Sequence, residues 1–224
     1  MNLYREEKKY GYIGKQLKDP LSFIMKRLWR GIHIIGTTFD SSSNKLAFKC
    51  FFYSLANLIP QGREYMYQFI KEYPIDNYLS TNSRAFYWTY LLHEFINLQL
   101  NKNYSFTFED AKELYDSDNI DKKIWGNAIW DIIHILAKYI PTDSNGKIPK
   151  EAKLIFMDFI NCIQKLLPCE LCRNHMIINM KKYNIEKYLD NRTDLFTWTV
   201  TIHNEVNKDN NKKKMSVKEA WILY

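Results

Sequence analysis

The apolar residues of this chain recur every three or four positions, the spacing that places them on one face of an α-helix. Two such stripes, one in each half of the chain, are Phe48, Phe51, Phe52, Leu55 and Ile59, and then Phe156, Phe159, Ile160, Ile163 and Leu167. Glycine (7) and proline (6) are scarce among the 224 residues, as is typical of long helices rather than of turn-rich sheets. The pattern predicts an all-α fold.

The same order of sequence landmarks occurs twice. Each half contains Trp-x3-His, an apolar segment that ends at proline, a connector with tyrosine, and Trp-x4-His-x3-Asn. These landmarks are Trp29, His33, Pro60, Trp88, His93 and Asn97 in the first half, and Trp130, His134, Pro168, Trp198, His203 and Asn207 in the second. Such self-similarity indicates a repeated structural unit. The alternative is a chance similarity between two aromatic-rich helical stretches.

The repeat and a polar connector suggest how the chain is divided. With 46% hydrophobic residues, 224 residues can bury one sizeable core or two small ones. The segment 116–123, "DSDNIDKK", is polar and is the natural boundary. We therefore predict an N-terminal tail at 1–20 and two tandem helical bundles at 21–115 and 120–224, each with four main helices and a short fifth.

The formal net charge of +7 does not by itself indicate a nucleic-acid partner. Lysine and arginine are spread along the chain, apart from a run at 212–214, which favours a solvated surface. Residues 1–20 are charged and lack the apolar core of a secretory signal, and no apolar run reaches the ~20 residues that span a bilayer. Four cysteines are too few for a disulfide-stapled secreted scaffold. We expect a soluble, intracellular protein.

The two halves differ where chemistry could occur. Pro168 is followed by Cys169 and Cys172, whereas Pro60 is followed by "QGRE". A proline that ends one helix and opens the next would put both cysteines in a first helical turn, where the helix dipole stabilises a thiolate and lowers its pKa. This setting favours a redox-active dithiol. Zinc held by Cys169, Cys172, His175 and His203 is one alternative, and a static disulfide or a pair of inert buried thiols is another.

The motifs of the second half, taken together, resemble a known family. "WGNAIWDIIHILAKYIP", "PCELCRNH" and "HNEVN", followed by a basic stretch, resemble the Erv/ALR family of FAD-linked sulfhydryl oxidases over about residues 120–224. The resemblance implies a small helical bundle that holds FAD beside a CxxC disulfide. It also implies oxidation of protein dithiols by O2 with release of H2O2. A non-catalytic binding or assembly protein on the same fold is the alternative.

The resemblance also implies roles for individual residues. Cys172 would be the cysteine next to the flavin, and Cys169 would exchange with substrate. The cofactor-binding residues implied are Gly126, Trp130, His134, Tyr139, Cys172, His175, His203, Asn204, Asn207 and Lys212, with Lys213 or Lys214 as possible substitutes for Lys212. The closing aromatic residue of the family would be Trp221 or Tyr224. No metal is implied.

The chain departs from the pattern of many family members, which carry a shuttle cysteine pair and a structural pair. Only Cys50 and Cys162 remain outside the CxxC motif, each in an apolar stripe where a buried, inert thiol is expected. Substrates would then reach Cys169 directly. Viral family members also lack the shuttle pair, and the composition is rich in Lys, Asn, Ile and Tyr. Both features favour a viral oxidase that acts on virion proteins, in the virion or the host cytoplasm or nucleus, with the mitochondrial intermembrane space as the alternative.

The first half resembles a degenerate copy of the second. It retains Trp29, His33, Trp88, His93, Asn97 and Lys102. Gln61 and Glu64 stand where the second half has its two cysteines, and Glu94 stands at the position of Asn204. A carboxylate near a phosphate-bearing cofactor would repel it. We predict a cofactor-free first half that packs on the catalytic half as an intramolecular pseudo-dimer, with further homodimerisation possible.

Overall fold

The computed structural model describes residues 20–102, 106–115 and 122–224. The predicted N-terminal tail, except Pro20, and residues 116–121 of the predicted connector lie outside the described residues. Within the described ranges the secondary structure consists of α-helices and short 3-10 helices, with no strand beyond one isolated bridge between Lys147 and Asn191. The prediction of an all-α protein is confirmed.

The helices follow one order on both sides of the connector. Before it come α2 (Pro20–Thr37), α3 (Lys45–Leu58), α4 (Arg63–Glu72), η1 (Ile75–Tyr78), α5 (Asn82–Gln99) and α6 (Phe108–Tyr115). After it come α7 (Lys122–Tyr139), α8 (Lys150–Leu166), α9 (Glu170–Lys182), η3 (Ile185–Tyr188), α10 (Arg192–Asp209) and α11 (Val217–Leu223).

Local sequence signals set the ends of α5 and α10. Thr81 caps α5, because its side chain accepts a hydrogen bond from the backbone N–H of Arg84, and Asn191 caps α10 in the same way through Asp194. Beyond the C-terminal ends, Asn101 and Asn211 adopt left-handed backbone conformations with φ of 50° and 54°. Asparagine tolerates this conformation better than most residues, so it can end a helix where glycine is absent.

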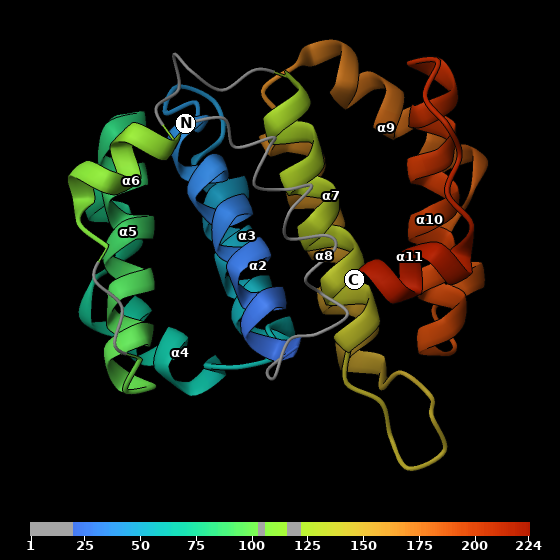
Figure 1. Ribbon diagram of the computed structural model, residues 1–224, viewed down its shortest axis with the longest axis horizontal. Coiled ribbons are helices and arrows are strands. Elements are labelled where there is room, and N and C mark those ends of the chain that lie inside the picture. Colours follow the sequence, from blue (N-terminus) through green and yellow to red (C-terminus); the bar gives the residue numbers. More distant parts are fainter. Residues whose placement is uncertain (1–19, 103–105, 116–121) are drawn as a thin grey trace.

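Helices α2, α3, α7 and α8 form the centre of the molecule, and α5 and α10 lie on its two outer sides (Figure 1). Helix α3 packs on α8, and α2 packs on α7. At the first contact the rings of Phe51 and Phe159 lie 5.8 Å apart. At the second, a Cβ atom on Gly31 would come within 2.5 Å of the Ile132 side chain, so glycine permits a close approach of the helices. Buried apolar residues of both halves form one continuous core.

Each half also contains one buried tryptophan that ties its helices to a connector. The indole N–H of Trp88 donates to the carbonyl of Tyr73 at 2.9 Å, and that of Trp198 donates to the carbonyl of Tyr183 at 2.7 Å. Both rings are almost inaccessible to solvent, so the hydrogen bonds satisfy polar groups that water cannot reach. No helix in the described ranges is both long and apolar enough to cross a bilayer.

Candidate functional site

Four aromatic side chains from three helices meet in the second half. The ring of Trp130 on α7 stacks on His203 of α10 at 4.2 Å with an interplanar angle of 5°. The ring of His134 lies next to this stack, with its centre 5.2 Å from that of His203 and 4.5 Å from that of Tyr224, the residue that follows α11. We call Trp130, His134, His203 and Tyr224 the ring cluster. Trp130 and His203 are partly exposed, whereas His134 and Tyr224 are buried, so the stack forms the accessible face.

A chain of hydrogen bonds fixes the two histidines of the ring cluster. The Thr199 hydroxyl donates to the carbonyl of Phe196 at 2.7 Å, so its oxygen accepts from Nδ1 of His134 at 2.8 Å. In neutral His134 the other nitrogen, Nε2, is then an acceptor, and Nδ1 of His203 donates to it at 2.9 Å. The same argument leaves Nε2 of His203 as an acceptor for a group bound at the stack.

Burial keeps both rings neutral at physiological pH. It lowers the pKa of His134 well below its usual value, and the neighbouring His203 and the charge of Arg27 act in the same direction. Burial also lowers the pKa of His203 to about 4, with a further contribution from the charge of Lys212. Lys212 follows the helix that carries His203, and its N–H donates to the carbonyl of Asn207 on that helix. Flat rings and a nearby cation suit a ligand that is aromatic at one end and anionic at the other.

The two cysteines lie where α8 gives way to α9. Cys169 is the N-cap residue of α9, and its sulfur accepts a hydrogen bond from the backbone N–H of Cys172 at 3.3 Å. Both side chains are partly exposed. The sequence predicted both cysteines within the first turn, but the helix begins at Glu170, so only Cys172 lies inside it. Pro168 precedes the cap residue. The side chain of Arg173 donates to the carbonyl of Leu167 at 2.6 Å, and this hydrogen bond fixes the turn between α8 and α9.

The zinc alternative requires Cys169, Cys172, His175 and His203 to converge. Among the residues that the structure describes, no group of three or more His, Cys, Asp or Glu side chains is arranged to hold a metal ion. Instead His203 is bound to His134 and stacked on Trp130. These residues therefore do not form the ligand cluster that the zinc alternative requires.

His175 lies on α9 beside the C-terminal end of α10. Its Nδ1 is 3.9 Å from the carboxylate of Asp209. Together with Ile178 and Asn179, these two residues line an open depression of about 370 Å³. Because the depression opens between α9 and α10, a ligand bound there could contact His175.

The basic stretch after α10 is held by backbone contacts. The N–H of Lys212 donates to the carbonyl of Asn207 at 2.7 Å, and the side chains of Lys212, Lys213 and Lys214 are exposed. The side chain of Asn204 exchanges two hydrogen bonds of 2.8 Å with the backbone of Met215. Asn204 therefore fixes the segment that leads into α11, a role that the sequence did not indicate.

Three further expected site residues, Gly126, Tyr139 and Trp221, lie on α7 and α11. No atom lies within 4 Å of a Cβ built on Gly126, so the space beside this turn of α7 is open. Trp221 packs edge-on against Phe196 at 4.8 Å, and Phe196 in turn lies 5.8 Å from His134. Of the two candidate closing aromatic residues, Tyr224 is part of the ring cluster, whereas Trp221 reaches it only through Phe196. Tyr139 lies at the end of α7, where the Lys138 ammonium is 5.7 Å from its ring.

Some residues of the site were not predicted. Thr199 follows Trp198 as Thr89 follows Trp88, so the repeat itself carried a signal for it. Nothing in the sequence indicated three others, because their contacts join helices that are distant in sequence: Asp131, Arg27 and Lys138. Asp131 is buried and accepts from Arg27 at 2.6 Å and from Arg30 at 3.2 Å, and Lys138 donates to the carbonyl of Trp221 at 2.7 Å.

Comparison with known proteins covers the part of the chain that holds these residues. The family model of the Erv1 / Alr family matches residues 127–223. An FAD-linked sulfhydryl oxidase of an African swine fever virus isolate is 34% identical over 100 residues, which cover 45% of this chain and 79% of that protein. A protein of Invertebrate iridescent virus 3, whose name assigns it the same activity provisionally, is 32% identical over 107 residues, 47% of this chain and 69% of that protein.

No solved structure gives a significant match to the chain. The similarity to the viral relatives covers most of their length, and the family model falls on the half of the chain that holds the ring cluster and the two cysteines. The chain belongs to the Erv1 / Alr family.

Proposed function

We propose that this chain is an FAD-dependent thiol oxidase that forms disulfide bonds in protein substrates. The observation that carries the proposal is the pair of cysteines at the start of α9, in the same half as a partly exposed Trp130–His203 stack. The family model matches this half of the chain, and the viral relatives are named as FAD-linked sulfhydryl oxidases. A dithiol and a flat cofactor site in one small helical domain are the two components that the reaction needs.

The proposed reaction is thiol–disulfide exchange at Cys169. A substrate thiolate attacks the Cys169 sulfur of a Cys169–Cys172 disulfide, and Cys172 leaves as a thiolate. A second substrate thiolate then attacks the mixed disulfide at the substrate sulfur, and Cys169 leaves as a thiolate. The substrate loses two electrons and two protons, and the cysteine pair gains the electrons. Bound FAD supplies the two-electron acceptor that reoxidises the pair and transfers the electrons to O2, yielding H2O2.

The chain's own groups favour the release of Cys172 in this exchange. Cys172 lies in the first turn of α9, where unpaired backbone N–H groups and the positive end of the helix dipole stabilise an anion. Cys169, as the cap residue, lies one turn further out and is accessible to a substrate thiol. This geometry supports assigning Cys169 to substrate exchange and Cys172 to the cofactor side.

The residues around the ring cluster fit FAD. Trp130 and His203 would provide flat surfaces for its rings, with Nε2 of His203 as a hydrogen-bond acceptor. His175 and Asn207 would line the path of the cofactor, and Lys212 would neutralise its pyrophosphate. The open space at Gly126 supports a close approach of the cofactor to α7.

The absorbance spectrum of the purified protein tests this proposal. We expect a yellow protein with flavin absorbance that consumes O2 when given dithiothreitol. Cys172→Ser should retain flavin and lose O2 consumption, whereas Cys50→Ser, which alters a thiol on α3, should keep it. A colourless protein that carries stoichiometric zinc would overturn the proposal in favour of the metal-site alternative.

We further propose that the two halves form an intramolecular pseudo-dimer. Its support is that residues at equivalent repeat positions contact each other: Phe51 meets Phe159, and Arg30 pairs with Asp131. Contacts between equivalent positions are the signature of a two-fold axis. Domains at 21–115 and 120–224 then correspond to the two protomers of a dimer, joined by a short linker that raises their effective concentration.

The first half, in this proposal, binds no cofactor. Its Trp29 and His93 stack at 4.2 Å, as Trp130 and His203 do, and Nε2 of His33 bonds Nδ1 of His93 at 3.0 Å. However, Trp29 and His93 are only 5% and 8% exposed. The ring of Phe106 lies 6.2 Å from His93 and helps to cover the stack. A covered stack and the absence of cysteines at Gln61 and Glu64 support a structural role for this half.

The viral relatives support a role in disulfide formation in viral proteins. We propose protein dithiols as substrates and the virion or the host cytoplasm or nucleus as the location. Fractionation of infected or expressing cells that finds the protein only in the mitochondrial intermembrane space would overturn this assignment.

A further inference from the structure

Helix α11 leads into Tyr224, the residue that completes the ring cluster. Tyr224, directly after the helix, is buried and lies 4.5 Å from the ring of His134. Because His134 holds His203 by a hydrogen bond of 2.9 Å, the position of Tyr224 bears on the exposed stack. The helix itself has only seven residues, too few to be stable without tertiary contacts. What holds α11 in place therefore matters for the site.

Two cations hold α11, and one of them comes from the other half of the chain. Lys138 of α7 donates to the carbonyl of Trp221 at 2.7 Å. Arg27 of α2 donates to the carbonyl of Leu223 at 2.7 Å, and its guanidinium lies 4.3 Å from the centre of the Tyr224 ring. The bond from Lys138 fixes the start of the last turn of α11. The contacts of Arg27 fix the end of this turn and the ring of Tyr224, which lies against His134.

Arg27 is itself held firmly. Its second nitrogen, Nη2, donates to the carboxylate of Asp131 at 2.6 Å, and the side chain of Asp131 is only 5% exposed. Asp131 directly follows Trp130 on α7, so it lies at the same height along this helix as the ring cluster. Arg27 thus bridges α7 and α11 at the point where both contribute to the site. A guanidinium can make these contacts together because its donors form a planar fork and its face can lie on an aromatic ring.

The bridge is not a consequence of the repeat. The position equivalent to Arg27 in the second half is Ala128, since Trp29 and Trp130 are equivalent. The second half therefore offers no matching arginine to α6, although Tyr115 at the end of α6 also lies against a histidine, 5.2 Å from His33. The arginine that joins the first half to the end of α11 therefore has no arginine counterpart at the equivalent position of the second half.

We infer that Arg27 is a positioning residue of the cofactor site: through Leu223 and Tyr224, the first half holds α11 against the ring cluster so that the Trp130–His203 stack can receive FAD. This inference rests on the proposed function. It gives the half without the CxxC pair a defined part in the reaction, because the catalytic half then lacks a complete site on its own. The contacts of Arg27 with Leu223, Tyr224 and Asp131 are contacts to the protein that frames the site, so its role is to position rather than to react.

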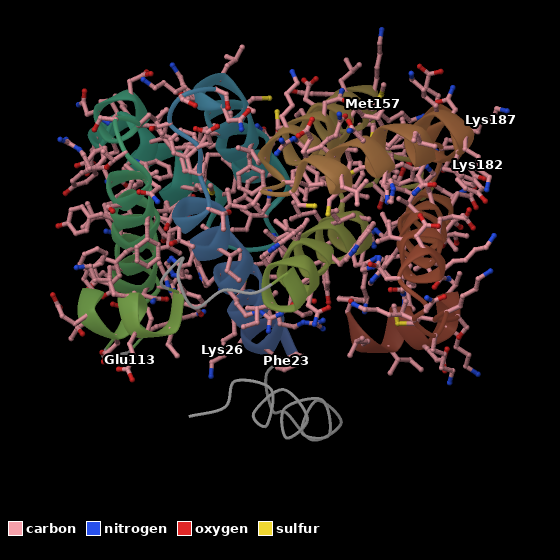
Figure 2. All side chains as sticks on the ribbon, turned by 90° about the horizontal axis from the view of Figure 1, so that it is seen from above. Phe23, Lys26, Glu113, Met157, Lys182 and Lys187 are labelled. Atoms are coloured by element: carbon pink, nitrogen blue, oxygen red, sulfur yellow. The ribbon has the colours of Figure 1, made fainter. Side chains whose placement is uncertain are left out.

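The test compares FAD retention in full-length variants. Arg27→Met removes the fork and keeps an unbranched side chain, and Arg27→Lys keeps the charge and one donor. Lys26→Ala is the matched control on the same helix, because Lys26 is exposed and its side chain projects outward from the protein (Figure 2). Arg84→Met is a second control, because Arg84 also donates to a backbone carbonyl, that of Asn77 at 2.8 Å, and lies 5.9 Å from the ring of Tyr78, but within the first half.

We expect Arg27→Met to raise the Kd for FAD at least tenfold, measured by flavin fluorescence, with Arg27→Lys between this variant and the native protein. Both controls should bind FAD as the native protein does. A double-mutant cycle with Tyr224→Leu should be non-additive, because Arg27 acts through Tyr224. An Arg27→Met protein that retains FAD normally would overturn the inference, and so would additive effects in the cycle.

Far-UV circular dichroism of the FAD-free Arg27→Met protein shows whether this variant folds. It therefore distinguishes a loss of folding from a loss of FAD affinity. If that variant does not fold, Tyr224→Leu alone replaces it, since it leaves the Arg27–Asp131 pair in place, and normal FAD affinity there would overturn the inference. A native protein without flavin would instead overturn the proposed function. The two failures are therefore distinguishable.

Discussion

Arg30 and Asp131 occupy the same position in the two copies of the sequence repeat, and their side chains pair with each other, with 3.2 Å between Nη2 and Oδ2. Asp131 also accepts from Arg27 at 2.6 Å, so one buried carboxylate faces two arginines of α2. This triad is the main polar contact between α2 and α7. In a symmetric pair of identical helices the same position would place like charges opposite each other.

Replacing Asp131 should destabilise the whole protein. Asp131→Ala removes the buried carboxylate that faces Arg27 and Arg30 and leaves the largely buried Arg27 guanidinium without this counter-charge. We expect a loss of about 3–5 kcal/mol in the free energy of unfolding. Urea titration followed by circular dichroism measures it. The exposed pair of Lys49 and Asp76 provides the control, because Asp76→Ala should cost less than about 1 kcal/mol. Equal effects of the two substitutions would contradict the importance of the triad.

Removing residues 1–115 should expose the face of α7 and α8 that α2 and α3 cover. We expect the remaining half to aggregate or to form a new homodimer, because its apolar contact residues would meet water. In a homodimer with the native geometry, Asp131 would meet its own copy, so Asp131→Asn should strengthen dimer formation. Size-exclusion chromatography with light scattering distinguishes the outcomes. A monomeric, fully stable fragment would show that the halves do not depend on each other.

The flavin content should be one FAD per full-length chain. The stack of Trp130 and His203 is accessible, whereas that of Trp29 and His93 is covered. Denaturing the purified protein and measuring released flavin against protein concentration gives the ratio. His203→Ala should lower it well below one, while His93→Ala should leave it near one. A ratio of two would mean that the first half also binds the cofactor.

The stability of the protein should fall as the pH is lowered from about 6.5 to 4. Burial lowers the pKa of His33 to about 3 and that of His203 to about 4, and it lowers the pKa values of His93 and His134 well below 6.5. These rings stay neutral in the folded protein and take up protons in the unfolded chain below pH 6.5. The unfolded state then binds more protons, and the free energy of unfolding decreases as pH falls.

His33→Gln tests the contribution of one ring while retaining hydrogen-bonding groups. The pH dependence of the free energy of unfolding should become shallower by about one proton, or ~1.4 kcal/mol per pH unit, between pH 6 and 4. Urea titrations at several pH values measure the slope. An unchanged slope would mean that His33 is protonated in the folded protein.

Cys50 and Cys162 should take no part in electron transfer. Cys162 is buried, and this burial is the main cause that raises its pKa. The neighbouring Cys50, across the α3–α8 contact, acts in the same direction, and a raised pKa disfavours the reactive thiolate. A Cys50→Ala/Cys162→Ala variant should keep the native rate of dithiothreitol oxidation, measured with an oxygen electrode. A rate reduced tenfold at unchanged flavin content would indicate that this pair relays electrons.

Periodicity, proline positions and the repeat predicted the helices and singled out Trp130, His134 and His203, because those features depend on local spacing. Tyr224 was indicated only by the family resemblance, as an alternative to Trp221. Trp130 and His134 lie one turn apart, and the landmark His203 identifies the facing helix. The docking of the two halves could not be predicted in the same way. Arg27 and Asp131 are 104 residues apart and occupy different repeat positions, so no periodic signal connects them. The two bonds from Asn204 to Met215 depend on the path of a loop, which spacing does not specify.

The close approach of α2 and α7 at Gly31 has a consequence for how the sequence can change over time. A helix that associates with a copy of itself receives every substitution twice, once on each side of the axis. Here the two helices are encoded separately, so Gly31 can face Ile132 and an arginine can face an aspartate. Each half accumulates changes independently, and one can lose its cysteines while the other keeps them. Joining the two copies in one gene therefore permits a division of labour that a symmetric assembly cannot reach.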